Sequence, residues 1–389
     1  MPIINRLADF HAEITEWRHD FHSNPELLFD VHRTVGKVEE LLKSFGVDEI
    51  VTGLGKTGLV ATIKGKSNKS GKTIGLRADM DALPIFEKTG KDYASKTDGK
   101  MHACGHDGHT AMLLGAAKYL AETRNFDGTV ALIFQPAEEG GGGGDAMVKD
   151  GIMETFNIDE VYGMHNFPGL PVGSFAIREG GIMAATDEFT IEIEGVGGHA
   201  AMPHLTIDPL VAGAHMITGL QTLVSRNVDP IKNAVLSVTA MIANDSYNVI
   251  SRTATLKGTV RTLDEEIRNL MEKRMNEFVP NSAAAFGAKA KLNFRRGYPV
   301  TVNAPKQTAF AGDIAAQIVG EKQVIRDISP TMGGEDFSYM LNERPGAYII
   351  IGQGNTAGLH EDTYDFNDEI IPIGCSYWIE LAQTAMPIK

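Results

Sequence analysis

The spacing of apolar residues predicts two long helices at the start of the chain. Apolar residues recur every three or four positions over residues 4–23, among them Ile4, Leu7 and Trp17, and again over residues 32–46. This is the spacing of one face of an amphipathic helix, so we expect a helix over each range.

Short apolar runs further along the chain predict buried strands. Each run is bounded by Gly, Pro or charged residues, and the runs are Leu59–Ile63, Ile74–Leu76, Val130–Phe134, Val161–Met164 and Tyr348–Ile351. Helical spacing separates or follows them over residues 110–121, 304–319 and 373–385. Strands that alternate with helices predict an α/β fold, a mixed and mostly parallel sheet flanked by helices on both faces.

The pattern changes near Ala185. Residues 187–194 alternate polar and apolar side chains, as a strand with one wet face does. The same region then predicts, in order, a helix over 207–224, strands over 234–242 and 254–262, and a helix over 265–278. We therefore expect an inserted α+β domain over residues 185–297, which makes the first domain discontinuous, 1–184 and 298–389.

Charge and cysteine content narrow the class of protein. The formal net charge of −14 argues against nucleic-acid or anionic-membrane partners, which need basic patches, but not against an anionic small molecule. Cys104 and Cys375 are the only cysteines, too few for a disulfide framework, which fits a reducing compartment. The N-terminal residues lack a signal-peptide core, and no window approaches ~18 apolar residues. We expect a cytoplasmic protein.

The segment His102–His109 is the densest cluster of candidate chemistry. It holds three histidines, an aspartate and Cys104, and imidazole and thiolate are ligands that Zn²⁺ and related ions prefer. Other candidates each follow a predicted strand: Asp79 and Asp81, Glu138 and Glu139, His165, and His360. A lone histidine after a strand is more often a hydrogen-bonded loop residue than a ligand. Four such strand ends favour a metal site, because sites in open α/β sheets form at the carboxyl ends of strands.

The neighbouring glutamates invite separate roles. Two adjacent carboxylates in a cleft repel each other, so one is best held by a cation while the other accepts a proton. A ligand beside a general base is what metal-assisted hydrolysis requires. A solvated acidic loop is the alternative, and it fits poorly with the apolar strand before Glu138. The glycines at 140–144 predict close backbone approach near the site.

Seven blocks in this order resemble the amidohydrolase branch of the metallo-aminoacylase and carboxypeptidase family. That branch includes hippurate hydrolases, N-acyl-amino-acid deacetylases and plant auxin–amino-acid conjugate hydrolases. The matching blocks are Gly75–Pro84, Met101–Thr110, Phe134–Gly140, Gly163–His165, Gly197–His204, Met332–Phe337, and His360 with Tyr364–Asp368.

The resemblance implies a site with two divalent metal ions and an inserted lid domain that forms a homodimer. It assigns the general acid/base to Glu138 and the orientation of a ligand to Asp81, and it assigns metal binding to Cys104, His106, Glu139, His165 and His360. It also implies that His199 stabilises the oxyanion, usually across a dimer interface, whereas the residues alone favour two loop histidines, His199 and His204, after a Gly-rich turn. His102, Asp107 and His109 are expected to support the ligands, but the sequence does not exclude them as ligands. A cysteine ligand favours Zn²⁺, and the mixed N/O ligation also admits Mn²⁺, Co²⁺ or Ni²⁺.

The substrate site is less defined by the sequence. The resemblance implies that the lid domain holds a substrate carboxylate, and Arg261 and Asn248 are the candidates for this role. Arginine offers a bidentate fork for the purpose, and a surface strand charge is the alternative for Arg261. The reaction expected is hydrolysis of an N-acyl amino acid. Alternatives are a metallo-carboxypeptidase or dipeptidase, and a catalytically silent metal- or ligand-binding protein. Relatives often place Asn-Pro after the last histidine, where this chain has Glu361-Asp362, so the substrate class is open.

Overall fold

The computed structural model describes residues 4–388, which divide into two compact units. The first unit comprises Met1–Gly180, Val302–Ser329 and Asp336–Lys389, and the second comprises Gly181–Thr301 and Pro330–Glu335. No helix within residues 4–388 is long and apolar enough to span a bilayer.

The first unit is built on an eight-stranded mixed sheet. Its strands, in spatial order, are β1 (Glu49–Leu54), β2 (Gly58–Lys64), β4 (Thr129–Gln135), β3 (Thr73–Asp79), β5 (Glu160–Phe167), β16 (Gly346–Gly352), β6 (Phe175–Ala176) and β15 (Val324–Ile325). The four central strands β4, β3, β5 and β16 are parallel, so their carboxyl ends meet at one edge. All five apolar runs of the sequence form strands here, because central parallel strands are buried on both faces.

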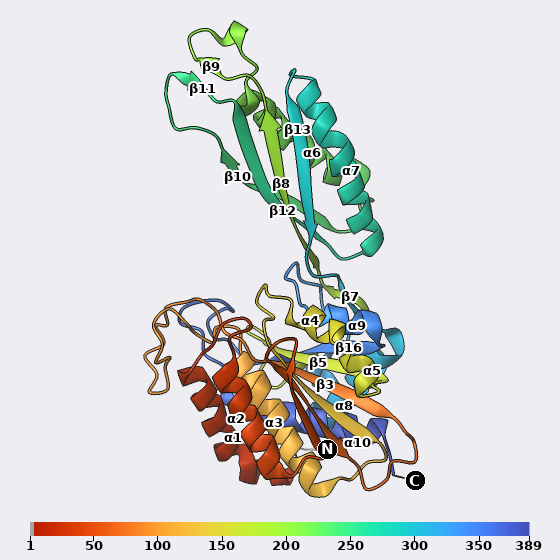
Figure 1. Cartoon of the computed structure of the whole chain (residues 1–389). Coiled ribbons are helices and arrows are strands. Elements are labelled where there is room, and N and C mark those ends of the chain that lie inside the picture. The colour runs from red at the N-terminus through yellow and green to blue at the C-terminus, as the bar shows by residue number, and fades with distance from the viewer. Residues whose placement is uncertain (1–3, 389) are drawn as a thin grey trace. The chain divides into compact units, whose positions relative to one another are not determined.

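Helices cover both faces of this sheet, as expected (Figure 1). The long helices are α1 (Asn5–Ser23), α2 (His32–Phe45), α3 (His106–Thr123), α8 (Pro305–Val319) and α10 (Ile371–Ala385). Figure 1 shows α3, α8 and α10 on one side of the sheet and the shorter α4 (Gly143–Lys149), α5 (Ile152–Thr155) and α9 (Ser338–Glu343) on the other. Short 3₁₀ turns occur at Glu321–Gln323 and Asp368–Ile370. Together the helices and sheet bury one continuous apolar core that includes Trp378, Phe134 and Leu113.

The second unit is an antiparallel sheet with two helices on one face. The strand order is β10 (Ala234–Ile242), β12 (Thr253–Thr262), β8 (Ala185–Glu194) and β13 (Lys289–Arg296). Helices α6 (Pro209–Asn227) and α7 (Glu265–Ala284) pack on it around a separate core, and α7 begins at the N-cap Asp264. A two-stranded ribbon, β9 (Gly198–His199) with β11 (Val249–Ile250), and a 3₁₀ turn at Pro203–Leu205 extend from one end of this sheet. The remaining strands are β7 (Gly180–Met183) and β14 (Thr301–Asn303).

Candidate metal centre

The predicted ligands converge at the carboxyl ends of the central strands. Asp79 ends β3 and Asp81 follows it, Glu138 and Glu139 follow β4, and His360 follows β16. The expectation for His165 was slightly wrong, because this residue lies inside β5, which continues to Phe167. The helix expected from residue 110 begins at His106, since its first turn is polar yet buried and carries no apolar spacing.

Five candidate ligands form overlapping groups. The ligand atoms of Cys104, His106 and His165 all lie within 4.8 Å of one another, and so do those of Cys104, Glu139 and His360. His106, Glu138 and Glu139 form a third such group. Cys104 Sγ is 3.4 Å from His165 Nε2, and His360 Nε2 is 3.3 Å from Glu139 Oε1. Groups that share members in this way can hold two ions side by side.

The imidazoles are oriented as metal ligands usually are. His106 donates its Nδ1 hydrogen to the Asp81 carbonyl at 2.8 Å, and His165 donates its own to the Asn166 carbonyl at 2.6 Å. Each bond fixes a tautomer that leaves Nε2 with a free lone pair, which is the usual arrangement behind a metal ligand. The Nε2 atom of His106 is buried and forms no geometrically acceptable hydrogen bond. The donor set therefore fits a divalent cation.

The electrostatics of the cluster also fit a cation. Burial and the Glu139 carboxylate raise the pKa of the Cys104 thiol. Hydrogen bonds to Cys104 and Glu139 raise the pKa of His360 to about 10, whereas burial and His109 hold the pKa of His165 well below its usual value. Cys104 and His360 therefore hold their protons more tightly than usual. A divalent ion bound to this cluster would displace those protons.

Asp81 positions the two glutamates. Its carboxylate is buried and accepts hydrogen bonds from the backbone N–H groups of Glu138, at 2.9 Å, and Glu139, at 3.1 Å. Burial raises the pKa of Asp81 even though His106 opposes the shift. One aspartate therefore holds a ligand histidine through its carbonyl and the Glu138–Glu139 backbone through its side chain.

The remaining polar residues of the His102–His109 segment support the cluster. His109 contacts Asp79 Oδ1 at 2.6 Å and Asn166 Oδ1 at 2.7 Å, so both of its ring nitrogens are engaged. Asp79 also accepts a bond from Arg77 at 2.6 Å, which compensates its charge without a metal. Although Asp79, His106 and His109 lie close enough to share an ion, these existing partners identify Asp79 and His109 as supports.

His102 and Asp107 belong to none of the potential ligand groups within residues 4–388. Burial lowers the pKa of His102 to about 3, so its ring is neutral. Asp107 pairs with Arg18 and His22 of α1. Arg18, His22 and Asn166 could not be singled out from the sequence, because their partners are distant along the chain.

Local backbone geometry explains several residues of the motif. Gly105 caps α3 with φ +97°, and a Cβ there would lie 2.1 Å from Asn166 Oδ1. A Cβ on Gly143 would lie 1.7 Å from the Pro136 carbonyl, so the glycine run does permit the close backbone approach expected near Glu138. Ala137 and His360 adopt left-handed backbone angles, φ +55° and +67°. Such strain in residues other than glycine concentrates at functional sites.

The predicted residues of the second unit lie at two ends of its sheet. His199 pairs with Val249 in the β9–β11 ribbon, and the Asn248 carbonyl accepts a hydrogen bond from Ala200 N at 3.0 Å, so His199 and Asn248 are neighbours. His199 is exposed, as is His204 in the adjoining turn. Arg261 is half-buried at the other end of β12, opposite Thr186, and burial lowers its pKa. The eight residue-to-residue steps of strand from Thr253 to Arg261 span about 26 Å at ~3.3 Å per residue.

Comparison with known proteins agrees with this architecture. The chain is 43% identical over 382 residues to a hippurate hydrolase of Campylobacter jejuni, which covers 98% of this chain and 99% of the relative. It is 39% identical to an N-acetylcysteine deacetylase of Bacillus subtilis, over 96% of this chain and 97% of that protein. The solved structure of the Bacillus subtilis YXEP protein, described as a dinuclear metal binding peptidase of the M20 family, matches with a TM-score of 0.86 at 36% identity, over 97% and 99% of the two chains. Residues 75–384 match the model of peptidase family M20/M25/M40, and the chain belongs to this family.

Proposed function

We propose that this protein hydrolyses N-acyl amino acids to a carboxylate and a free amino acid with the help of two divalent metal ions. The observation that carries the proposal is the convergence of five donor side chains beside Glu138, whose backbone Asp81 holds in place. The relatives named above act on hippurate and N-acetylcysteine according to their names, and both are N-acyl amino acids.

Five residues would hold the ions: Cys104, His106, Glu139, His165 and His360. Bound there, divalent ions would lower the pKa of water and polarise the amide carbonyl. The thiolate favours Zn²⁺, while the mixed donor set also suits Mn²⁺, Co²⁺ or Ni²⁺.

Glu138 supplies the proton transfers. Its carboxylate lies beside that of Glu139 and is not needed to complete the Cys104 groups, so we assign it the transfer of a proton from the attacking water to the leaving amine. The site lies among buried residues, where such transfers compete little with bulk water.

The second unit would supply the oxyanion donor His199 and the carboxylate-binding residues Asn248 and Arg261. His199 and Asn248 lie at the opposite end of the sheet from Arg261, and the stretch of β12 from Thr253 to Arg261 alone spans about 26 Å at ~3.3 Å per residue, farther than one small substrate reaches. If all three serve one substrate, Arg261 comes from one copy of the chain, and His199 and Asn248 come from another.

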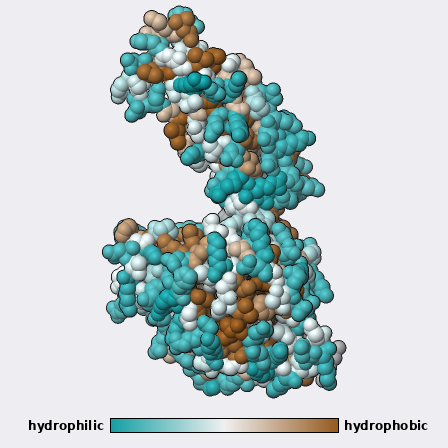
Figure 2. All heavy atoms as spheres, in the orientation of Figure 1, coloured by the Kyte–Doolittle hydropathy of each residue, from teal (hydrophilic) through white to brown (hydrophobic). Residues whose placement is uncertain are grey.

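This geometry supports a homodimer. Exposed apolar side chains surround the β9–β11 end of the second unit, among them Val196, Met202, Leu205, Tyr247 and Val249. Figure 2 shows hydrophobic side chains gathered on this part of the surface. Exposed apolar patches of this kind mark association surfaces.

The test compares the protein with its Glu138→Gln variant on N-benzoyl and N-acetyl amino acids, with dipeptides as competing substrates and metal content measured in parallel. We expect turnover of N-acyl amino acids and a loss of about 10²–10⁴ in kcat for Glu138→Gln with its metals retained. A metal-replete Glu138→Gln variant with full activity would overturn the role of Glu138. Turnover of dipeptides alone would indicate a peptidase, and no turnover of any substrate would indicate a silent binding protein.

A further inference from the structure

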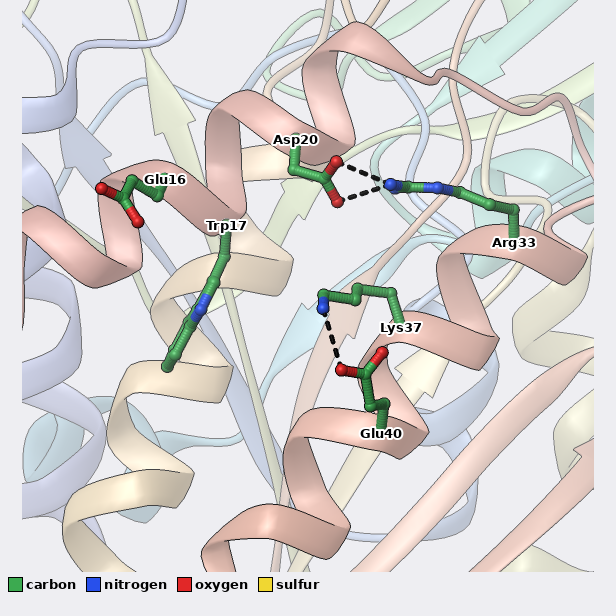
Figure 3. A pocket seen from close by; sticks show the side chains of 6 residues that line it. All are labelled: Glu16, Trp17, Asp20, Arg33, Lys37 and Glu40. Carbon is green, nitrogen blue, oxygen red and sulfur yellow. Dashed lines mark hydrogen bonds and ion pairs between the residues drawn. The ribbon is translucent and has the colours of Figure 1, made fainter.

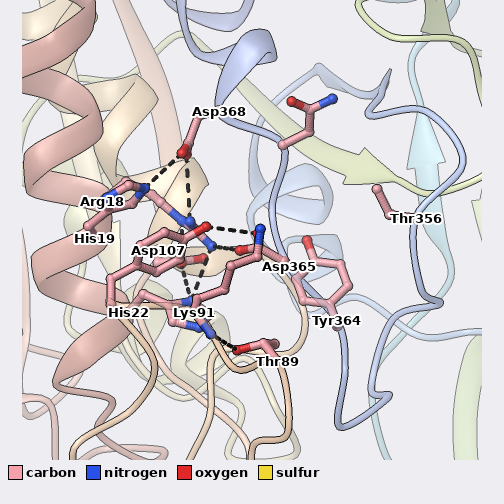
Figure 4. Close-up of polar contacts among 12 residues, drawn as sticks. Arg18, His19, His22, Thr89, Lys91, Asp107, Thr356, Tyr364, Asp365 and Asp368 are labelled. Carbon is pink, nitrogen blue, oxygen red and sulfur yellow. Dashed lines mark hydrogen bonds and ion pairs between the residues drawn. The ribbon is translucent and has the colours of Figure 1, made fainter.

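A fully buried arginine connects the two segments that carry the candidate ligands. Arg18 lies on α1, and its guanidinium has no exposed surface. Figure 4 shows it at the centre of a polar network drawn from α1, the loop over residues 84–100, the start of α3 and the loop that follows His360.

The contacts of Arg18 are specific. Its Nε donates to Asp107 Oδ2 at 2.9 Å, and its Nη2 donates to Asp365 Oδ1 at 2.7 Å. Asp365 also accepts a hydrogen bond from the Tyr93 hydroxyl at 2.8 Å, and Asp107 accepts one from His22 Nδ1 at 2.8 Å. Its Nη1 also lies 3.6 Å from Asp368 Oδ1, so one guanidinium connects Asp107 with two carboxylates of a segment that is distant in the sequence.

Each carboxylate is tied to a ligand-bearing segment. Asp107 directly follows His106 at the start of α3, and Asp365 follows His360 by five residues. The two segments also meet through their backbones, since His360 N donates to the Ala103 carbonyl at 2.7 Å. Arg18 adds a second, side-chain connection between them.

His360 depends on such an anchor more than the other ligands do. Its side chain is half-exposed, its backbone is left-handed at φ +67°, and it lies in a loop outside any helix or strand. A loop residue in a strained backbone conformation persists only where the surrounding structure holds it in that conformation. Asp365, which is bound by the buried Arg18, holds the His360 loop in this conformation.

We propose that Arg18 is a positioning residue for the metal centre, which sets the spacing between the Cys104–His106 segment and His360. The proposal rests on the proposed two-metal function. Stability alone is a poor explanation for this network, because buried ion pairs often contribute little to the free energy of unfolding compared with apolar packing. Side chains that orient ligands from behind typically change metal affinity by about 10- to 100-fold when removed.

Three variants separate positioning from folding. Arg18→Met removes the connection at its centre, and Arg18→Lys retains the charge but not the fork. Asp365→Ala is milder, because Asp365 is partly exposed and Arg18 keeps its bond to Asp107. It should loosen the His360 segment alone, which then keeps only the longer Arg18–Asp368 pair at 3.6 Å.

Arg33→Met is the matched control. Arg33 also joins an aspartate of α1, since its Nη2 lies 2.6 Å from both carboxylate oxygens of Asp20. Figure 3 shows this pair in an exposed groove between α1 and α2, where Lys37 and Glu40 form a second pair. None of these residues neighbours a candidate ligand in sequence.

The experiment measures affinity for Zn²⁺ and Co²⁺ in chelator-stripped protein by competition, with the Co²⁺–thiolate absorption as a report on Cys104. Circular dichroism and denaturant unfolding of the stripped variants establish that they fold. We expect at least a tenfold loss of affinity for one of the two metal equivalents in Asp365→Ala, a larger loss in Arg18→Met, partial recovery in Arg18→Lys, and no change in Arg33→Met.

Folded Asp365→Ala with the metal affinity and Co²⁺ spectrum of the unmodified protein would overturn the proposal, even if Arg18→Met failed to fold. Equal losses in Arg33→Met would also overturn it, because the effect would then be general destabilisation. If the unmodified protein bound no metal, both this inference and the proposed function would fall. If it bound metal without hydrolysing any N-acyl amino acid, only the proposed function would fall.

Discussion

Asp81→Asn should slow the reaction by disturbing the backbone of the catalytic glutamate. The two oxygens of the Asp81 carboxylate accept N–H groups from Glu138 and Glu139 at 2.9 and 3.1 Å. An asparagine offers one oxygen and one NH₂ group, so one of these N–H groups would face another donor. The carbonyl that holds His106 belongs to the backbone and is unchanged.

The expected size of the effect follows from that single lost bond. A hydrogen bond to a charged group contributes about 1.5–3 kcal/mol of stabilisation, and the N–H group that loses its acceptor is buried. At ~1.4 kcal/mol per tenfold, this predicts a decrease of about 10- to 100-fold in kcat/KM. The loss should fall mainly on kcat, because Glu138 acts in the transition state.

The assay is hydrolysis of N-benzoylglycine with saturating metal, with metal content measured on the same samples. Asp127→Asn is the control, because Asp127 also accepts two backbone N–H groups, from Lys69 and Ser70, at the opposite edge of the sheet. Both bonds reach Asp127 Oδ1, which asparagine retains, so this variant should leave kcat unchanged. An Asp81→Asn enzyme within threefold of the unmodified protein would refute the positioning role of Asp81.

Two further predictions concern stability. Burial alone would lower the pKa of His22, but Asp107 and Glu87 outweigh burial and raise that pKa above 6.5. The free energy of unfolding lost in His22→Gln should therefore be largest below about pH 6.5 and should shrink as pH rises through the raised pKa. Denaturant titrations across this pH range would measure the loss. Gly143→Ala should lower the free energy of unfolding by about 1–3 kcal/mol and reduce activity, since its Cβ would overlap the Pro136 carbonyl, whereas Gly36→Ala in α2, where the Cβ has open space, should stabilise the fold by about 0.5–1 kcal/mol. Thermal or denaturant unfolding of the pair would check this, and equal behaviour of the two variants would contradict it.

The fold was accessible from the sequence where burial controls the side-chain pattern. The central strands appear as continuous apolar runs because both of their faces are covered. Strand β13 was missed although Ala290, Leu292 and Phe294 alternate with polar residues, a signal that charged neighbours made weak. The first turn of α3 was missed for a different reason, since its inward-facing residues are polar.

The candidate site likewise contains residues that could be predicted from the sequence and residues that could not. Ligands at strand ends could be predicted because topology brings those ends together. Arg18 could not, because on α1 it occupies a position like any other in an amphipathic helix, and only the folded chain brings it to Asp107 and Asp365. The joint role of Arg261 and Asn248 in substrate binding stays a prediction, and the length of β12 supports the proposal that they come from two copies of the chain.

The contacts of Asp362 and the exposure of Glu361 explain how the loop that carries His360 accommodates these two acids. Asp362 pairs with Lys88 through its side chain, and its carbonyl accepts the Lys88 backbone N–H at 2.7 Å, so the loop over residues 84–100 is fastened to the segment that carries His360. Lys88 offsets the charge of Asp362, and Glu361 is exposed, where solvent and salt screen its charge. Neither acid therefore places an uncompensated buried charge beside the ligands, and a substrate with a free carboxylate is compatible with both. The Lys88–Asp362 ion pair thus holds this loop from its exposed side, which agrees with the proposed role of Arg18 on the buried side of the same segment.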